Sequence, residues 1–116
     1  DSAGTAEYHI GKPPYKLSIE VAAKNGLDIT NQRARQFSIN DFDKFDIIYA
    51  MDESNFRNIL SLARNKEDEQ KVSMILNEIH SNKNLSVPDP YYGGDQGFID
   101  VYEMLDEACD IITKKL

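Results

Sequence analysis

The segment VPDPYYGGDQGF (residues 87–98) concentrates the residue types of this sequence that are best suited to chemistry. It places Asp89 between two prolines and directly before the tyrosines Tyr91 and Tyr92. Because proline and glycine fix unusual backbone angles, the segment is expected to have a defined shape. A carboxyl group held in this way can exchange protons. Asp also favours turns, however, and from these residues alone a plain Pro-Tyr turn is the preferred interpretation.

The other residues that often carry chemistry form no site of their own. His9 and His80 have no cysteines or acids beside them at the spacing of metal ligands, so we expect neither a metal site nor a cofactor. The acidic run at residues 41–46 lacks the central glycine and the terminal glutamate of a calcium loop. Cys109 is expected on the apolar face of a helix, where a buried cysteine behaves as a small hydrophobic residue.

Composition narrows the class of protein. The 116 residues, with 41% hydrophobic and 28% charged side chains, are typical of one globular domain without repeats or linkers. A net charge of −7, with the acids spread along the chain, disfavours nucleic acid and anionic membranes as partners. The apolar runs are too short to span a membrane. One cysteine cannot form an internal disulfide, which favours a reducing, cytoplasmic location.

Helix and strand signals alternate along the chain. They predict a helix at residues 15–25 that ends at Gly26, a capping box at residues 38–41 with a short helix after it, and a helix at residues 52–63 capped by Asp52 or Ser54. Short apolar runs at residues 46–51 and 71–76 predict buried strands, and apolar spacing at residues 98–112 predicts a long last helix. This order is typical of an α/β domain with a mostly parallel sheet.

The expected sheet is small for such a domain. Besides the two strands, only a strand end in DSAGT, turning at Gly4, is visible, whereas four or more strands are usual. The sequence begins with Asp1 rather than Met and enters organised sequence at once. We therefore expect a processed or truncated start and a missing central element.

Five motifs occur in an order that resembles the low-molecular-weight protein tyrosine phosphatase family: DSAGT, IGKPP, ARQ, YAMDESN and VPDPYYGGDQGF. They cover nearly the whole chain, and MDESN together with DPYYGG at this separation is a specific signal. The resemblance implies a small three-layer α/β/α domain, phosphotyrosine phosphatase I-like, with a four-stranded parallel sheet in the intact family. It implies that residues 1–116 are one N-terminally incomplete phosphatase domain without the family's first strand, Cys-x5-Arg phosphate loop and first helix.

The family's reaction is the hydrolysis of a phosphomonoester through a phosphocysteine intermediate, without a metal. A thiolate attacks phosphorus while backbone N–H groups and an arginine hold the phosphate oxygens. Asp89 matches the family's general acid, which protonates the leaving phenolate and then serves as general base for water, an effect of roughly 10²–10⁴-fold. The implied partner is a phosphotyrosine-containing protein or a small aryl phosphate, and the implied assembly is a monomer or weak dimer.

The resemblance also assigns aromatic walls to the pocket. Tyr8 and Tyr91 match positions on opposite walls, where a flat phenyl phosphate gains stacking contacts. Tyr92 follows Tyr91, and the alternative is that one of these two rings packs into the core; we expect Tyr91 to face outward. Without the resemblance, Tyr8 would be an exposed tyrosine of little significance.

Three further positions match supporting residues of the family. Asp52 matches an aspartate that holds the phosphate-loop arginine, although it can equally be the N-cap of the next helix, or both. Ser2 matches a serine whose hydroxyl supports the phosphate loop. Gln32 stands where many members have a histidine, and since glutamine carries no charge, any pH-dependent support from that position is in doubt.

Other functions remain open at this point. No Cys-x5-Arg occurs in these residues, because position 115, six residues after Cys109, is a lysine. The chain can therefore instead be an inactive fragment or a pseudo-phosphatase that acts as a binding module. A phosphoarginine phosphatase differs only in substrate. Arsenate reduction is disfavoured, because no cysteine lies between Met51 and Pro88.

Overall fold

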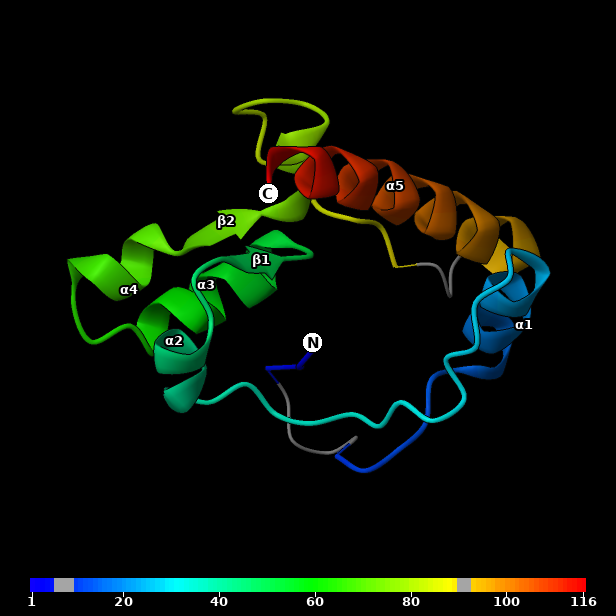
Figure 1. Cartoon of the computed structure of the whole chain (residues 1–116), viewed down its shortest axis with the longest axis horizontal. Helices are drawn as coiled ribbons and strands as arrows, with labels where there is room; N and C mark the ends of the chain where they lie inside the picture. The colour runs from blue at the N-terminus through cyan, green and yellow to red at the C-terminus, as the bar shows by residue number, and fades with distance from the viewer. Residues whose placement is uncertain (6–9, 90–92) are drawn as a thin grey trace.

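This computed structural model describes residues 1–5, 10–89 and 93–116 and contains a two-stranded parallel sheet with helices beside it (Figure 1). The strands are β1 (Ile48–Ala50) and β2 (Val72–Met74). The helical elements are α1 (Lys16–Lys24), α2 (Asn40–Lys44), α3 (Glu53–Ser61), α4 (Lys66–Gln70), the 3-10 helix η1 (Ile75–Glu78) and α5 (Gly94–Lys115). In the part of the chain that is described, no helix combines the length and the apolar character that crossing a membrane requires.

The parallel pairing that the sequence predicts is confirmed. Ile48 pairs with Val72 and Ala50 with Met74, and α3 packs against both strands. One core forms around this contact, with Phe42 fully buried and packed edge-to-face on Phe37 at a centroid distance of 5.3 Å. Burial of this apolar surface is what stabilises so short a sheet.

Both strands are shorter than their apolar runs predict. The first run continues on either side of β1, and the second leaves the sheet after Met74, where Ile75 and Leu76 enter η1. These two side chains stay buried, but they pack with Ala108 of α5 instead of extending the strand. An apolar run predicts that its residues are buried, but it does not fix their backbone conformation. Here the apolar residues of the second run are buried partly in a strand and partly in a 3-10 helix.

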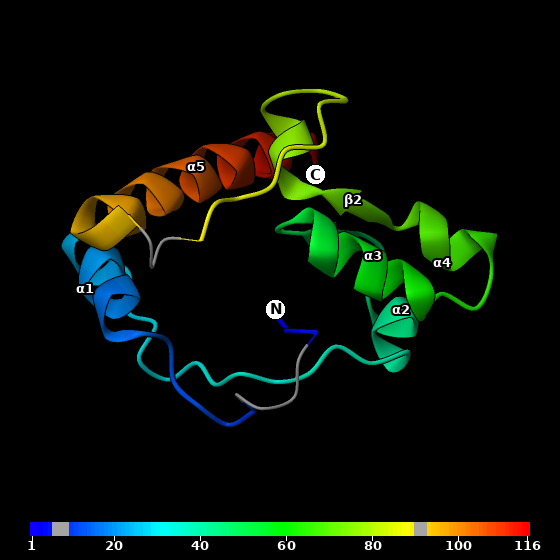
Figure 2. The same cartoon turned by 180° about the vertical axis from the view of Figure 1, so that it is seen from behind.

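The N-terminal strand end predicted in DSAGT is an isolated bridge. Gly4 pairs in parallel with Gln36, through hydrogen bonds from Gly4 N–H to the Arg35 carbonyl (2.8 Å) and from Phe37 N–H to the Gly4 carbonyl (2.6 Å). The described residues thus form two strands and this bridge, fewer than the four strands implied for an intact domain. Both views place the N-terminus between the sheet on one side and α1 and α5 on the other (Figures 1 and 2).

Helix α1 agrees with its prediction. It ends beside Gly26, whose φ of +81° lies in the left-handed region that favours glycine. The N–H groups of Asn25 and Gly26 donate to the carbonyls of Ala22 and Ala23 and so close the last turn. Chain reversal after α1 is therefore set locally.

Helix α4 was not predicted, because its polar residues carry no apolar stripe. Its signal is Asn65, whose side-chain oxygen accepts the N–H of Asp68 at 2.9 Å and caps the first turn. Asp68 is buried and binds the Arg64 Nε at 2.9 Å. A capping residue followed by acids, as in Asn65 to Glu69, predicts such a helix even where apolar residues show no helical periodicity.

Helix α5 is longer than its apolar stripe and is anchored at its C-terminal end. Lys115 Nζ donates to Glu78 Oε2 at 2.6 Å, and the Tyr49 hydroxyl donates to Glu78 Oε1 at 3.0 Å. Burial and the neighbouring carboxylate of Glu78 raise the pKa of Tyr49 to about 12.

The expectation that Cys109 is buried was wrong: the thiol is exposed, because α5 is left uncovered on that side by a cavity.

The predicted capping box forms in half. Asp41 Oδ2 accepts the N–H of Ser38 at 2.9 Å, whereas the Asp41 N–H donates to the Ser38 carbonyl at 2.9 Å rather than to its hydroxyl. Asp41 is buried and also accepts Arg35 Nη1 at 3.0 Å, and Arg35 reaches Asp1 at 3.1 Å. Burial raises the pKa of Asp41, but the hydrogen bonds from Arg35 and Ser38 outweigh it, so the pKa lies below its ordinary 3.8.

Replacing Asp41 with asparagine should change the pH dependence of stability. Because the folded-state pKa is lowered, the carboxylate stabilises the fold above the unfolded pKa of 3.8, and this contribution disappears as the pH falls through the folded pKa. Chemical denaturation should show Asp41→Asn less stable than the parent near pH 7, with the gap closing below about pH 4. The exposed Asp46→Asn is the control. A gap that stays constant from pH 7 to pH 3 contradicts the prediction.

Candidate functional site

Two hydrogen bonds fasten the segment before Asp89 to the carboxyl end of β1. The Val87 N–H donates to the Met51 carbonyl at 2.7 Å, and the Glu53 N–H donates to Ser86 Oγ at 3.0 Å. This segment therefore lies where β1 ends and α3 begins. In open parallel sheets, ligand sites gather at this end of the strands.

Asp52 occupies the turn between β1 and α3. Its Oδ1 accepts the Asn55 N–H at 2.7 Å, so Asp52 rather than Ser54 is the N-cap of α3. The simpler of the two roles foreseen for Asp52 is thus confirmed. Asp52 is half-buried, and within the described part of the chain it makes no ion pair.

Asp89 is exposed and lies two residues after the Val87 tether. The backbone on the N-terminal side of this exposed residue is held by the Val87 tether. The tyrosines assigned to the pocket walls, Tyr8, Tyr91 and Tyr92, lie outside the described residues.

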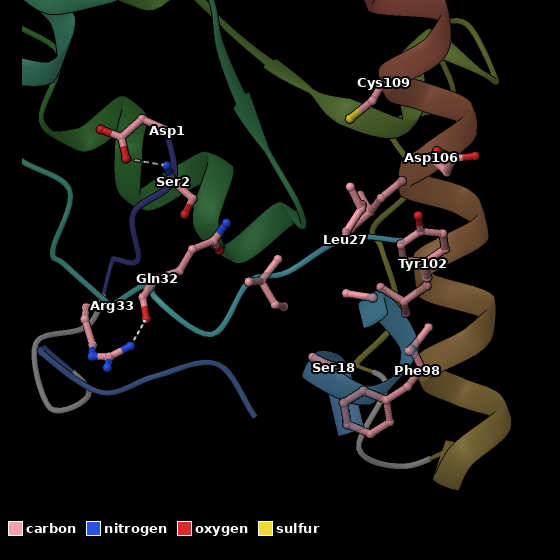
Figure 3. Close-up of a pocket in the computed structure, with 15 residues that line it drawn as sticks. Asp1, Ser2, Ser18, Leu27, Gln32, Arg33, Phe98, Tyr102, Asp106 and Cys109 are labelled. Carbon is pink, nitrogen blue, oxygen red and sulfur yellow. Dashed lines mark hydrogen bonds between the residues drawn. The ribbon is translucent and has the colours of Figure 1, made fainter. Parts of the chain in front are cut away.

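A cavity of about 720 Å³ opens between the N-terminal residues and the pair formed by α1 and α5 (Figure 3). Asp1, Ser2 and Gln32 lie on one side of it, and Phe98 and Tyr102 of α5 lie on the other (Figure 3). Ser2 and Gln32, which the resemblance assigns to one supporting network, are thus brought to the same cavity.

A second cavity of about 260 Å³ runs along β1. It is bounded by Ile48 and Ala50 of the strand, by Ile59 of α3, and by Asp1 and Ser2. Since Asp1 and Ser2 line both cavities, the N-terminal residues separate two spaces whose other walls are largely apolar. In the part of the chain that the structure describes, β1 pairs with β2, and the second cavity lies along β1.

The N-terminal segment is also tied to α3, a contact that the motifs did not indicate. Thr5 Oγ1 donates to Asn55 Oδ1 at 2.9 Å, and Asn58 Nδ2 lies 3.5 Å from Thr5 Oγ1. Because Asn55 also donates its N–H to Asp52, one residue joins the N-terminal segment to the end of β1. Asn55, the last residue of the DESN motif, is the sequence feature that could have indicated this contact.

Comparison with known proteins gives one consistent result. The family model described as low molecular weight phosphotyrosine protein phosphatase matches residues 1–116. The chain is 44% identical over 116 residues to the Synechocystis protein slr0328. It is 42% identical over 118 residues to the low molecular weight phosphotyrosine protein phosphatase of Schizosaccharomyces pombe. Each alignment covers 100% of this chain and 73% of the relative.

Solved structures show the same arrangement. A protein tyrosine phosphatase from Entamoeba histolytica, with Hepes in its active site, superposes with a TM-score of 0.89 at 34% identity over 99% of this chain and 72% of that one. Wzb from Vibrio vulnificus, in complex with benzylphosphonate, superposes with a TM-score of 0.81 at 29% identity over 93% of this chain and 70% of that one. The elements described above are therefore arranged as in these structures.

Two substitutions at Asp52 should separate its cap from its charge. Asp52→Ala removes the acceptor for the Asn55 N–H and should lower the free energy of unfolding by about 1 kcal/mol, whereas Asp52→Asn keeps an acceptor and should cost a few tenths. Urea denaturation of the two variants measures the difference. Equal losses in both would show that the charge, not the cap, carries the stabilisation.

Proposed function

Because the chain belongs to the low molecular weight phosphotyrosine protein phosphatase family, we propose that it works as a protein tyrosine phosphatase when a Cys-x5-Arg phosphate loop completes the domain. The observation that carries the proposal is the tether of the Asp89 segment to the carboxyl end of β1 through Val87 and Met51. The general acid and the phosphate site of such an enzyme must meet, and the strand ends are where an α/β sheet offers a phosphate site.

The complete domain, in this proposal, is a three-layer α/β/α unit with a four-stranded parallel sheet, of which residues 1–116 are one N-terminally incomplete domain. A further strand fits beside β1, on the side opposite β2. Support comes from the apolar cavity along Ile48 and Ala50 and from the parallel bridge at Gly4 beyond it. A strand there would form backbone hydrogen bonds with the edge of β1 opposite β2.

The reaction has two steps. A thiolate of the phosphate loop attacks phosphorus, forming an S–P bond while the P–O bond to the aryl group breaks, and Asp89 donates its proton to the leaving oxygen. Asp89, now ionised, then takes a proton from water as the water oxygen attacks phosphorus and the S–P bond breaks. Phosphate leaves, and both the thiolate and the protonated acid are restored.

Five other residues take supporting roles in this proposal. Tyr8 and Tyr91 form aromatic walls that select a flat aryl phosphate, with Tyr92 beside them. Asp52 holds the loop arginine while it caps α3, and its half-buried place at the end of β1 supports this double role. Ser2 supports the phosphate loop, consistent with its position between the two cavities.

The substrate class in this proposal is a phosphotyrosine-containing protein or a small aryl phosphate. Support comes from relatives: the Wzb structure of Vibrio vulnificus holds benzylphosphonate, an aryl compound with a phosphorus oxyanion. Family membership itself leaves the substrate open between phosphotyrosine and related phosphorylated side chains.

A second candidate is a binding module without activity. The 116 residues contain one cysteine, and Cys109 has Lys115 where the motif requires arginine. With an acid and pocket walls but no nucleophile, such a chain could hold a phosphorylated ligand without cleaving it. A test for the nucleophile decides between the two candidates.

The 116-residue chain alone should release no phosphate from p-nitrophenyl phosphate, because it holds no Cys-x5-Arg nucleophile. The same chain extended at its N-terminus by its own upstream residues should be active if these encode that loop. Release of p-nitrophenolate, followed by absorbance, measures both. Turnover by the 116 residues alone would disprove our placement of the nucleophile.

In the active protein, Asp89→Ala should slow turnover of aryl phosphates with poor leaving groups by roughly 10²-fold or more. The loss should shrink for p-nitrophenyl phosphate, whose phenolate needs little protonation to leave. Asp95→Ala, another exposed acid of the same region, is the matched control and should behave as the parent. An unchanged rate in Asp89→Ala removes this residue from the mechanism.

A further inference from the structure

An aromatic stack joins the starts of the two helices that flank the larger cavity. The rings of Tyr15 and Phe98 lie with centroids 5.4 Å apart and planes 25° apart, an offset-stacked pair. Tyr15 directly precedes α1, and Phe98 lies in the first turns of α5, where it is 6% exposed. Figure 3 shows Phe98 beside α1, and Figure 2 shows the two helices side by side.

Phe98 anchors one end of the segment that carries Asp89. The other end is the Val87 tether to Met51, so the acid lies between a backbone hydrogen bond and a buried ring. The tether fixes the backbone only up to residue 87. The described chain resumes at Gly93, directly before α5, so the position of the start of α5 fixes the far end of the segment.

Tyr15 is 54% exposed, and the chain just before it is held by hydrogen bonds. Two prolines precede it and fix the φ angles of the chain just before it. Before them, Gly11 and Lys12 exchange hydrogen bonds with Ala34: the Gly11 N–H donates to the Ala34 carbonyl at 2.7 Å, and the Ala34 N–H donates to the Lys12 carbonyl at 2.8 Å. The Tyr15 ring, against which Phe98 packs, therefore follows a segment that is held by hydrogen bonds to Ala34.

The length of α5 makes this contact important. Its C-terminal end is pinned by the Lys115 and Tyr49 bonds to Glu78, but α5 has 22 residues and is thus about 33 Å long. A tilt of about 2° about that pinned end moves its start by about 1 Å. Errors of this size in the placing of a catalytic group can cost about 10²-fold in rate.

We propose that Tyr15 is a positioning residue: its ring holds Phe98, and through Phe98 it keeps the Asp89 carboxyl group aligned with the leaving oxygen. This inference rests on the proposed function of Asp89. Tyr15 touches neither phosphorus nor the leaving oxygen in this scheme. Its loss should therefore impair proton donation selectively and leave attack on phosphorus intact.

The test compares Tyr15→Ala, Tyr15→Phe and Ile99→Ala in the extended, active protein. Tyr15→Phe keeps a ring that can stack, and Ile99→Ala removes an exposed apolar side chain next to Phe98 as a control for general loosening of α5. Tyr15→Ala should lower kcat on phenyl phosphate about 10-fold and on p-nitrophenyl phosphate less than about 3-fold. Tyr15→Phe and Ile99→Ala should keep the parent rates on both substrates.

A double variant sharpens the result. If Tyr15 acts through Asp89, adding Tyr15→Ala to Asp89→Ala should cause no further loss on phenyl phosphate. Equal losses on the two substrates, additive losses in the double variant, or no loss in Tyr15→Ala would each overturn the proposal. An equal loss in Tyr15→Phe and Tyr15→Ala would also overturn it, because the ring would then not be the cause.

A readout independent of activity separates this inference from the proposed function. Amide hydrogen exchange at positions 87, 89 and 93–98 should be faster in Tyr15→Ala than in the parent and in Ile99→Ala. Unchanged exchange shows that the stack does not hold the segment, whatever the activity. Failure of the parent protein to release phosphate from either substrate overturns the proposed function, and with it the alignment of Asp89 with a leaving oxygen.

Discussion

Much of this structure depends on what happens at the carboxyl end of β1. Within three residues the chain leaves the strand at Met51, caps α3 with Asp52 and donates the Glu53 N–H to Ser86. The carbonyl of Met51 is not used within the sheet and accepts the Val87 N–H instead. A long connection after β2 is thereby brought back to the point where β1 ends, which is why residues far apart in sequence can share one site.

The contacts that surround this point differ in kind. Near the sheet, apolar side chains pack around Phe42. Ion pairs with buried partners lie beside them, such as the pair of Arg35 with the buried Asp41. On the other side, α1 packs against α5, and Tyr15, which precedes α1, stacks on Phe98 of α5. Two cavities separate these halves, and the N-terminal residues lie between them.

Particular residues show which structural features can be predicted from short stretches of sequence. Gly26 and Asp52 were predicted at the ends of helices and are found there, because capping is decided within four residues of chain. Helix α4 was missed because periodicity does not reveal a polar helix, although its cap at Asn65 was readable. The burial of Cys109 was wrong for another reason: an apolar stripe says which face turns inward but not whether another element covers it.

The sequence by itself determined the family, the alternation of strands and helices and the identity of the candidate acid, because motifs, caps and short-range periodicity are properties of neighbouring residues. Only the tertiary structure decided that Val87 returns to β1, that Thr5 meets Asn55 and that Tyr15 stacks on Phe98. Those contacts join segments separated by tens of residues. Their formation depends on how the helices pack around the sheet, and no local pattern specifies that packing.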